Sequence, residues 1–136
     1  MPRLKELLFP WPPRALRWRR PVQLVLRTVH VVSMAVVLGG VAFGVAAGGY
    51  RTAFLVAAAS GALLLAVDVA RSGVYLWTGA GLATLAKLVL LGLGYHLPAH
   101  RWAFFLAATV VASVGSHMSG AWRHWSLLDR KELRLD

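Results

Sequence analysis

Histidine is the residue type in this chain best suited to chemistry. The sequence contains five histidines, no cysteine and five acidic residues. Two of the histidines, His30 and His117, lie within long apolar stretches, where ionisable side chains are costly and are functional more often than in soluble cores. A neutral imidazole nitrogen binds transition metals and haem iron. His30 and His117 are therefore the first candidates for a pair of ligands.

The remaining residue types exclude several classes of function. The sequence has no HExxH motif, no phosphate-binding glycine loop, no paired carboxylates suited to acid–base chemistry and no Ser-His-Asp order. Without cysteine, disulfides, thiolate metal sites and iron–sulfur clusters are excluded. Hydrolysis and phosphoryl transfer are disfavoured, and a bound metal would need histidine, methionine or oxygen ligands.

Membrane-crossing helices are expected to position the histidines. Hydrophobic residues make up 58% of the 136 residues, and the mean hydropathy of +0.62 lies outside the range of soluble domains. Apolar stretches long enough to cross about 30 Å of hydrocarbon as helices are predicted at residues 22–47, 52–70, 74–97 and 102–122. Because the links between them are very short, the expected fold class is an all-α membrane protein, an up-down bundle of four transmembrane helices.

Basic residues set the expected orientation. Of the fifteen lysines and arginines, seven lie at or before Arg27 and four follow Ala121. The positive-inside rule then predicts two cytoplasmic termini and a multi-pass protein of the plasma (inner) membrane. The first apolar stretch is too long for the core of a signal peptide, so we expect it to remain as an uncleaved span. The expected organisation is a basic interfacial segment at 1–21, a transmembrane domain at 22–122 and a cytoplasmic amphipathic tail at 123–136.

Helical periodicity predicts which side chains face the interior of the bundle. Gly40, Gly44 and Gly48 recur every fourth residue of the first span, a small-xxx-small pattern that allows another helix to approach closely. At about 100° per residue, His30 falls within about 80° of this stripe. The helical face that carries His117 in the fourth span is also rich in small residues. Both histidines are therefore expected to point into the bundle.

Two imidazoles that project inward at similar depth suit the axial positions of a b-type haem. The predicted topology puts His30 about 12 Å and His117 about 8 Å from the cytoplasmic ends of their spans. Met34, one turn after His30, offers a softer ligand for haem or copper, or simply fills space. The alternative for each histidine is a hydrogen bond to a backbone carbonyl or a serine hydroxyl, which would join helices without a cofactor.

Other polar residues lie in or beside the spans. Lys87 is about 20 Å into the third span, so its charge must be neutralised, paired or solvated. His96 and His100, at the outer surface, could bind a cation or belong to a solvated rim. Asp68 is expected to pair with Arg71, three residues later, or to carry a proton or a counter-charge beside His30.

Two segments resemble known families. The sequence RTVHVVSMAVVLGG, which contains Arg27, His30 and Gly40, resembles the first span of the small haem-binding membrane protoporphyrinogen oxidases of bacteria and of the related copper-resistance membrane proteins. In those families a basic residue precedes a histidine and a glycine follows about ten positions later. The sequence LAKLVLLGLGYH, from Leu85 to His96, resembles their third span. The resemblance implies association with haem or copper, with His30 as a ligand.

The predicted function is a multi-pass membrane protein that binds b-type haem between its first and fourth helices and acts as an electron-transfer or oxidoreductase subunit, with a quinone or a cytochrome as partner. One alternative is a cofactor-free structural or assembly subunit of a larger membrane complex or a homo-oligomer. Another is copper handling, for which Met34, Met118 and the histidines are the available ligands. Nucleic acid is not an expected partner, because the basic residues flank the spans. The candidate cofactor-binding residues are His30, His117, Met34 and Lys87, and the candidate metal ligands are His30, His117, His96 and His100.

Overall fold

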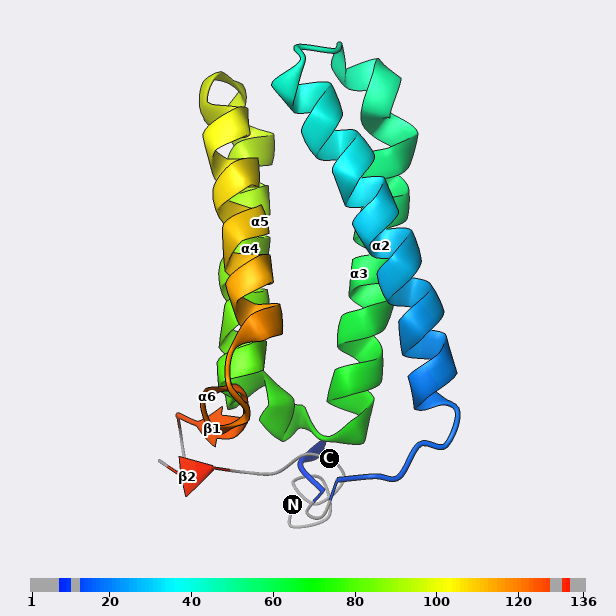
Figure 1. Ribbon diagram of the computed structural model, residues 1–136, viewed down its shortest axis with the longest axis vertical. Helices are drawn as coiled ribbons and strands as arrows, with labels where there is room; N and C mark the ends of the chain where they lie inside the picture. Colours follow the sequence, from blue (N-terminus) through cyan, green and yellow to red (C-terminus); the bar gives the residue numbers. More distant parts are fainter. Residues whose placement is uncertain (1–7, 11–12, 128–130, 133–136) are drawn as a thin grey trace. The chain divides into compact units, whose positions relative to one another are not determined.

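The computed structural model describes residues 8–10, 13–127 and 131–132 (Figure 1). Apart from one short pair of strands, the described regular structure is helical, as expected. The chain divides into two compact units. We call residues 15–71 the N-terminal hairpin, and the described residues before 15 and from 72 onward the C-terminal unit. The remaining residues of the predicted segments 1–21 and 123–136 lie outside the described part.

The N-terminal hairpin consists of two long helices, α2 (Arg19–Ala42) and α3 (Ala47–Arg71). Helix α2 begins before Pro21, which the first turn accommodates because its amide would have no helical partner there. The helices are joined by a tight link in which Gly44 adopts a φ of 66°, a left-handed conformation that favours glycine. Val37 and Ala57, which are 0% and 1% exposed, lie in the core of the hairpin.

The predicted glycine stripe is wrong, because α2 ends before the stripe is complete. Gly44 lies in the link and Gly48 lies in α3. Only Gly40 belongs to α2, and there it does allow a close approach: a Cβ on Gly40 would lie 2.7 Å from Cδ1 of Tyr50. In the sequence the three glycines are spaced as if on one helix, but the left-handed turn at Gly44 places Gly40 and Gly48 in different helices.

The C-terminal unit contains a second helical hairpin, α4 (Gly79–His96) and α5 (Arg101–His117). The 3-10 helix η1 (Gly73–Trp77) precedes α4, and η2 (Pro98–His100) joins α4 to α5. Helix α4 begins later than predicted because the Thr78 hydroxyl accepts a hydrogen bond of 3.3 Å from the amide of Gly81, which caps the helix.

Glycine positions also explain how closely α4 and α5 pack. The Phe105 ring is 2% exposed and lies against Gly94, where a Cβ would be 2.7 Å from two ring carbons. Gly92, two residues earlier on α4, has nothing within 4 Å of its Cβ position. Gly94 and Gly92 therefore lie on the same helix but differ in packing, so they suit a comparison of substitutions.

Exchanging each of these glycines for alanine should separate packing from helix propensity. Gly94→Ala is expected to destabilise the protein by about 1–3 kcal/mol, because the added methyl group overfills the site. Gly92→Ala is expected to leave stability unchanged or to raise it by up to about 1 kcal/mol. Unfolding of both variants in a mixed-detergent titration measures the difference. Equal stabilities would contradict the packing of Phe105 on Gly94.

The chain after α5 departs from the predicted span at 102–122 and from the predicted amphipathic tail at 123–136. Helix α5 ends at His117 rather than near residue 122, because Met118 turns to an extended conformation with a ψ of 147°. A short helix, α6 (Gly120–His124), leads to strand β1 (Trp125–Ser126), which pairs in antiparallel fashion with β2 (Lys131–Glu132). Ser126 is fully buried and bridges to Thr78, and the Leu127 amide donates to the Trp77 carbonyl at 3.0 Å.

Three of the described helices, α2, α3 and α4, are long and apolar enough to cross a membrane. Their outer surfaces carry large apolar side chains, such as Leu24 (68% exposed), Val31 (64%) and Val89 (63%). Continuous apolar surface of this kind is unfavourable in water but suits contact with lipid. The observed helices therefore support an all-α membrane protein. Helix α5 has 17 residues, one fewer than α4 and well below the 24 and 25 residues of α2 and α3.

Candidate functional site

His30 lies in the interface of the N-terminal hairpin, as the sequence predicted. Its Nδ1 is 2.8 Å from the carbonyl oxygen of Ala57 and 3.3 Å from Oγ of Ser60, both on α3. Ser60 donates its own hydroxyl proton within α3, toward the Val56 carbonyl at 2.7 Å or the Ala57 carbonyl at 3.1 Å. The Ser60 oxygen can therefore act toward His30 as an acceptor.

These contacts fix the tautomer of the imidazole. A carbonyl oxygen can only accept a hydrogen bond, so Nδ1 of His30 carries the proton that it donates to Ala57. In the neutral ring the lone pair then resides on Nε2. Ligands of metals and haem iron commonly show this arrangement, in which one ring nitrogen donates to a carbonyl and the other binds the metal.

Gly61 provides the surface on which the His30 ring rests. A Cβ on Gly61 would lie 2.9 Å from Cε1 and 3.2 Å from Nδ1 of the ring. No side chain larger than hydrogen fits at this position without moving the imidazole. The orientation of His30 is thus set from two sides, by the Ala57 carbonyl and by the bare backbone of Gly61.

A second polar contact joins the two helices of the hairpin nearer to the start of α2. Nε2 of Gln23 donates to Oδ1 of Asp68 at 2.7 Å, and the Gln23 side chain is only 6% exposed. Gln23 precedes His30 by seven residues, which is about two helical turns or 10 Å. Sequence reasoning assigned Asp68 to Arg71 and did not single out Gln23, although a buried glutamine in an apolar helix is itself a sign of a polar partner.

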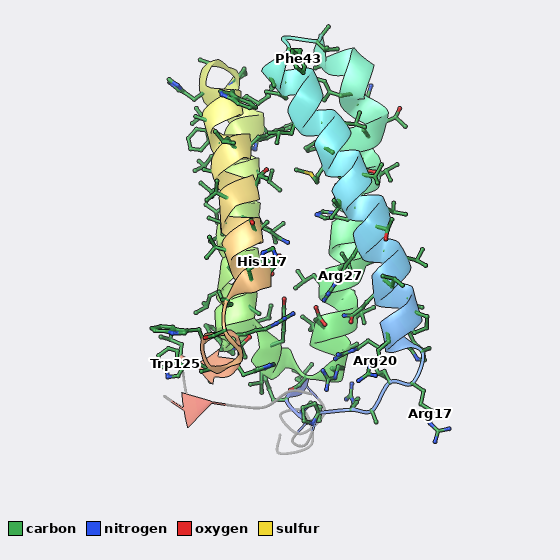
Figure 2. The ribbon with its side chains drawn as sticks, viewed as in Figure 1. Arg17, Arg20, Arg27, Phe43, His117 and Trp125 are labelled. Carbon is green, nitrogen blue, oxygen red and sulfur yellow. The ribbon has the colours of Figure 1, made fainter. Side chains whose placement is uncertain are left out.

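His117 occupies a different setting at the end of α5 (Figure 2). Its ring Nδ1 lies 2.9 Å from the Ser113 carbonyl oxygen of its own helix, so this histidine also carries its proton on Nδ1. The side chain is exposed, as are Leu106 and Val110 on the same face, whereas Phe105 and Ala108 pack against α4. Within its own unit His117 therefore lies exposed at a helix end, and its expected position inside a four-helix bundle stays a prediction.

His30 and His117 belong to different units, so their pairing stays a prediction from the sequence. Both histidines make a hydrogen bond to a backbone carbonyl, but only the bond of His30 joins two helices, as the alternative to ligation requires, because the bond of His117 lies within α5. These bonds are compatible with ligation because they engage Nδ1 in each case. Met34 is half-buried one turn after His30 on α2.

The remaining candidates lie in the C-terminal unit. Lys87 is half-buried on α4, one turn after Thr84, whose hydroxyl is 3.2 Å from the Tyr75 hydroxyl. His96 and His100 are both exposed at the far end of the α4–α5 hairpin, where the His96 ring meets Tyr95 edge to face. Within the described residues, no group of three or more histidine, cysteine, aspartate or glutamate side chains could hold a metal ion. The rim histidines are therefore not part of a larger ligand cluster there.

The sequence predicted His30 as a candidate but not the residues on α3 that contact its ring. Ala57, Ser60 and Gly61 are ordinary residues of an apolar helix, and only the register between α2 and α3 identifies them. A serine and a glycine side by side in an apolar span were the available signal. Comparison with known proteins adds no further constraint, because no family model, curated protein or solved structure matches the chain.

Proposed function

We propose that this protein is a multi-pass inner-membrane protein that binds b-type haem and serves as an electron-transfer or oxidoreductase subunit. The observation that carries the proposal is the geometry of His30. Its Nδ1 donates to the Ala57 carbonyl, so Nε2 carries the lone pair of the neutral ring and is the nitrogen that would bind iron. An absorbance spectrum of detergent-purified protein, with a Soret band and a sharp α band, is the direct test.

The donor set of this chain suits haem iron. Bound haem would supply one-electron redox chemistry, with imidazole as the axial ligand. The protein's own residues hold the His30 imidazole in one orientation, with a proton on Nδ1, through Ala57 and Gly61. The proposed second ligand is His117, on the basis of the predicted topology and of the same Nδ1–H tautomer. Apolar side chains of the helices would surround the macrocycle.

The proposal includes four spans and two cytoplasmic termini. Helix α5 packs along α4 after a short link, so it returns toward the side from which α4 began. Its 17 residues extend about 25 Å, which is within reach of a locally thinned bilayer. The arginines that flank the start of α2 favour the cytoplasmic side for that end.

Single-cysteine labelling should reveal this topology. The natural chain has no cysteine, so only the introduced cysteine of this protein can react. Ala46→Cys and Ala99→Cys lie in the two links at exposed positions. Both are expected to react with a membrane-impermeant maleimide in intact spheroplasts. Ala15→Cys and Ser119→Cys, also exposed, should react only after the membrane is opened. Labelling of Ala15→Cys in intact spheroplasts, or protection of Ala99→Cys, would contradict the proposed arrangement.

A cofactor-free subunit of a larger membrane complex is the second candidate. It is supported by the contacts that join α2 to α3, since His30 with Ala57 and Gln23 with Asp68 would tie the helices together without any ligand. The same purification separates the two candidates. A colourless protein that takes up no added haem and co-purifies with partners in fixed ratio would select the structural role.

A further inference from the structure

A group of arginines lies exposed at the start of α2. Arg17, Arg20 and Arg27 appear together at this end of the hairpin, whereas Phe43 marks the opposite end of α2 (Figure 2). Arg20 and Arg27 are seven residues apart, so they share one helical face and are separated by about 10 Å along the axis. Leu24 lies between them and is 68% exposed. We call Arg20, Leu24 and Arg27 the arginine face.

The charge of this face is not balanced within the hairpin. Residues 15–71 contain six arginines and a single acid, Asp68. The Asp68 carboxylate is engaged in the helix interface, where it accepts the hydrogen bond from the buried Gln23. Charge complementarity therefore favours an anionic partner from outside the hairpin.

The position of Arg27 along α2 indicates which kind of anion could bind to the arginine face. Arg27 lies eight residues, or about 12 Å, beyond the start of α2 at Arg19. Exposed apolar side chains follow on the same helix, including Val31 at 64%. A guanidinium at the edge of an apolar band extends toward the level of the lipid headgroups. Trp18, which is 51% exposed, belongs to the residue type that prefers the same level.

We propose that the arginine face binds the phosphate of an anionic phospholipid headgroup, with the acyl chains lying along the apolar surface beyond Arg27. The planar guanidinium donors match phosphate oxygens in a two-point fashion, which an ammonium group cannot reproduce. The pair of arginines brackets Leu24 and offers donors from both sides of the headgroup. This site is independent of the proposed haem ligands, and its test does not require haem.

Lipid binding to the detergent-purified full-length protein tests the proposal. Native mass spectrometry, with phosphatidylglycerol or phosphatidylcholine titrated into the micelles, gives an apparent dissociation constant for each lipid. Arg20→Gln and Arg27→Gln are each expected to weaken phosphatidylglycerol binding about fivefold, as follows from about 1 kcal/mol per basic residue. Arg51→Gln is the matched control, because Arg51 is exposed on α3 at the other end of the hairpin. It should change binding less than twofold.

Some results of the lipid titration would contradict the proposed phospholipid site. Equal affinity of the wild-type protein for the two lipids, or an equal loss in Arg27→Gln and Arg51→Gln, would overturn the proposal. Displacement of the lipid by millimolar inorganic phosphate would overturn the lipid assignment and indicate a soluble anion instead. Arg27→Lys keeps the charge and should show a smaller loss than Arg27→Gln. Helical circular dichroism of each variant checks that the hairpin persists.

Discussion

Replacing His30 by alanine should abolish the haem spectrum of the purified protein. The substitution removes the imidazole that donates to the Ala57 carbonyl and that we propose as an iron ligand. Loss of a supporting hydrogen bond alone typically lowers metal affinity about 10- to 100-fold. Loss of the ligand itself should lower haem affinity by more than this factor. The measurement is the Soret absorbance per protein after purification and after addition of excess haem.

The matched control for this experiment is His100→Ala. His100 is exposed in η2 at the rim of the C-terminal unit, so its removal should leave the spectrum unchanged. His117→Ala should retain some haem and shift the Soret band, because one proposed axial ligand would remain. An unchanged spectrum in His30→Ala would refute its role as a ligand. If His30→Ala and His100→Ala lose haem equally, binding does not depend on the histidine that the hairpin orients.

The helical class was predictable from the sequence because hydropathy and length are properties of single segments. The positions of the helix ends were not, since they depend on local backbone chemistry. Gly44 breaks the first apolar stretch by adopting a left-handed conformation, which moves the link earlier than charge and hydropathy suggest. Thr78 delays the start of α4 by capping it. Hydropathy is insensitive to both effects, because glycine and threonine are common inside membrane helices.

The candidate site was also predictable only in part, because helical periodicity is a property of one segment whereas contacts between helices are not. The orientation of His30 toward a neighbouring helix follows from the helical period, but its partners on α3 follow from the register between helices. The register depends on which small residues meet, such as Gly40 with Tyr50 and Gly61 with His30. The contact of Ser126 with Thr78 is likewise tertiary, and the amphipathic pattern of the tail concealed it.

Enlarging Gly61 should displace His30 while the hairpin persists. The Cβ of Gly61→Ala would lie 2.9 Å from Cε1 of His30, and the clash falls on the far end of a side chain that can rotate. The helices therefore need not separate, but the ring must leave the position in which Nδ1 meets the Ala57 carbonyl. We expect haem affinity to fall about 10- to 100-fold, as for loss of a ligand's supporting contact.

The control for Gly61→Ala is Gly39→Ala on α2, because nothing lies within 4 Å of the Cβ position of Gly39. Both substitutions add one methyl group to a helix of the same hairpin, so effects of helix propensity cancel in the comparison. Haem titration reports the affinity, and unfolding in mixed detergent reports whether the hairpin is intact. A loss of haem in Gly61→Ala with unchanged stability would tie affinity to the orientation of His30. Equal affinities in the two variants would mean that the position of the His30 ring does not control binding, and that its bond to Ala57 serves only to join α2 and α3.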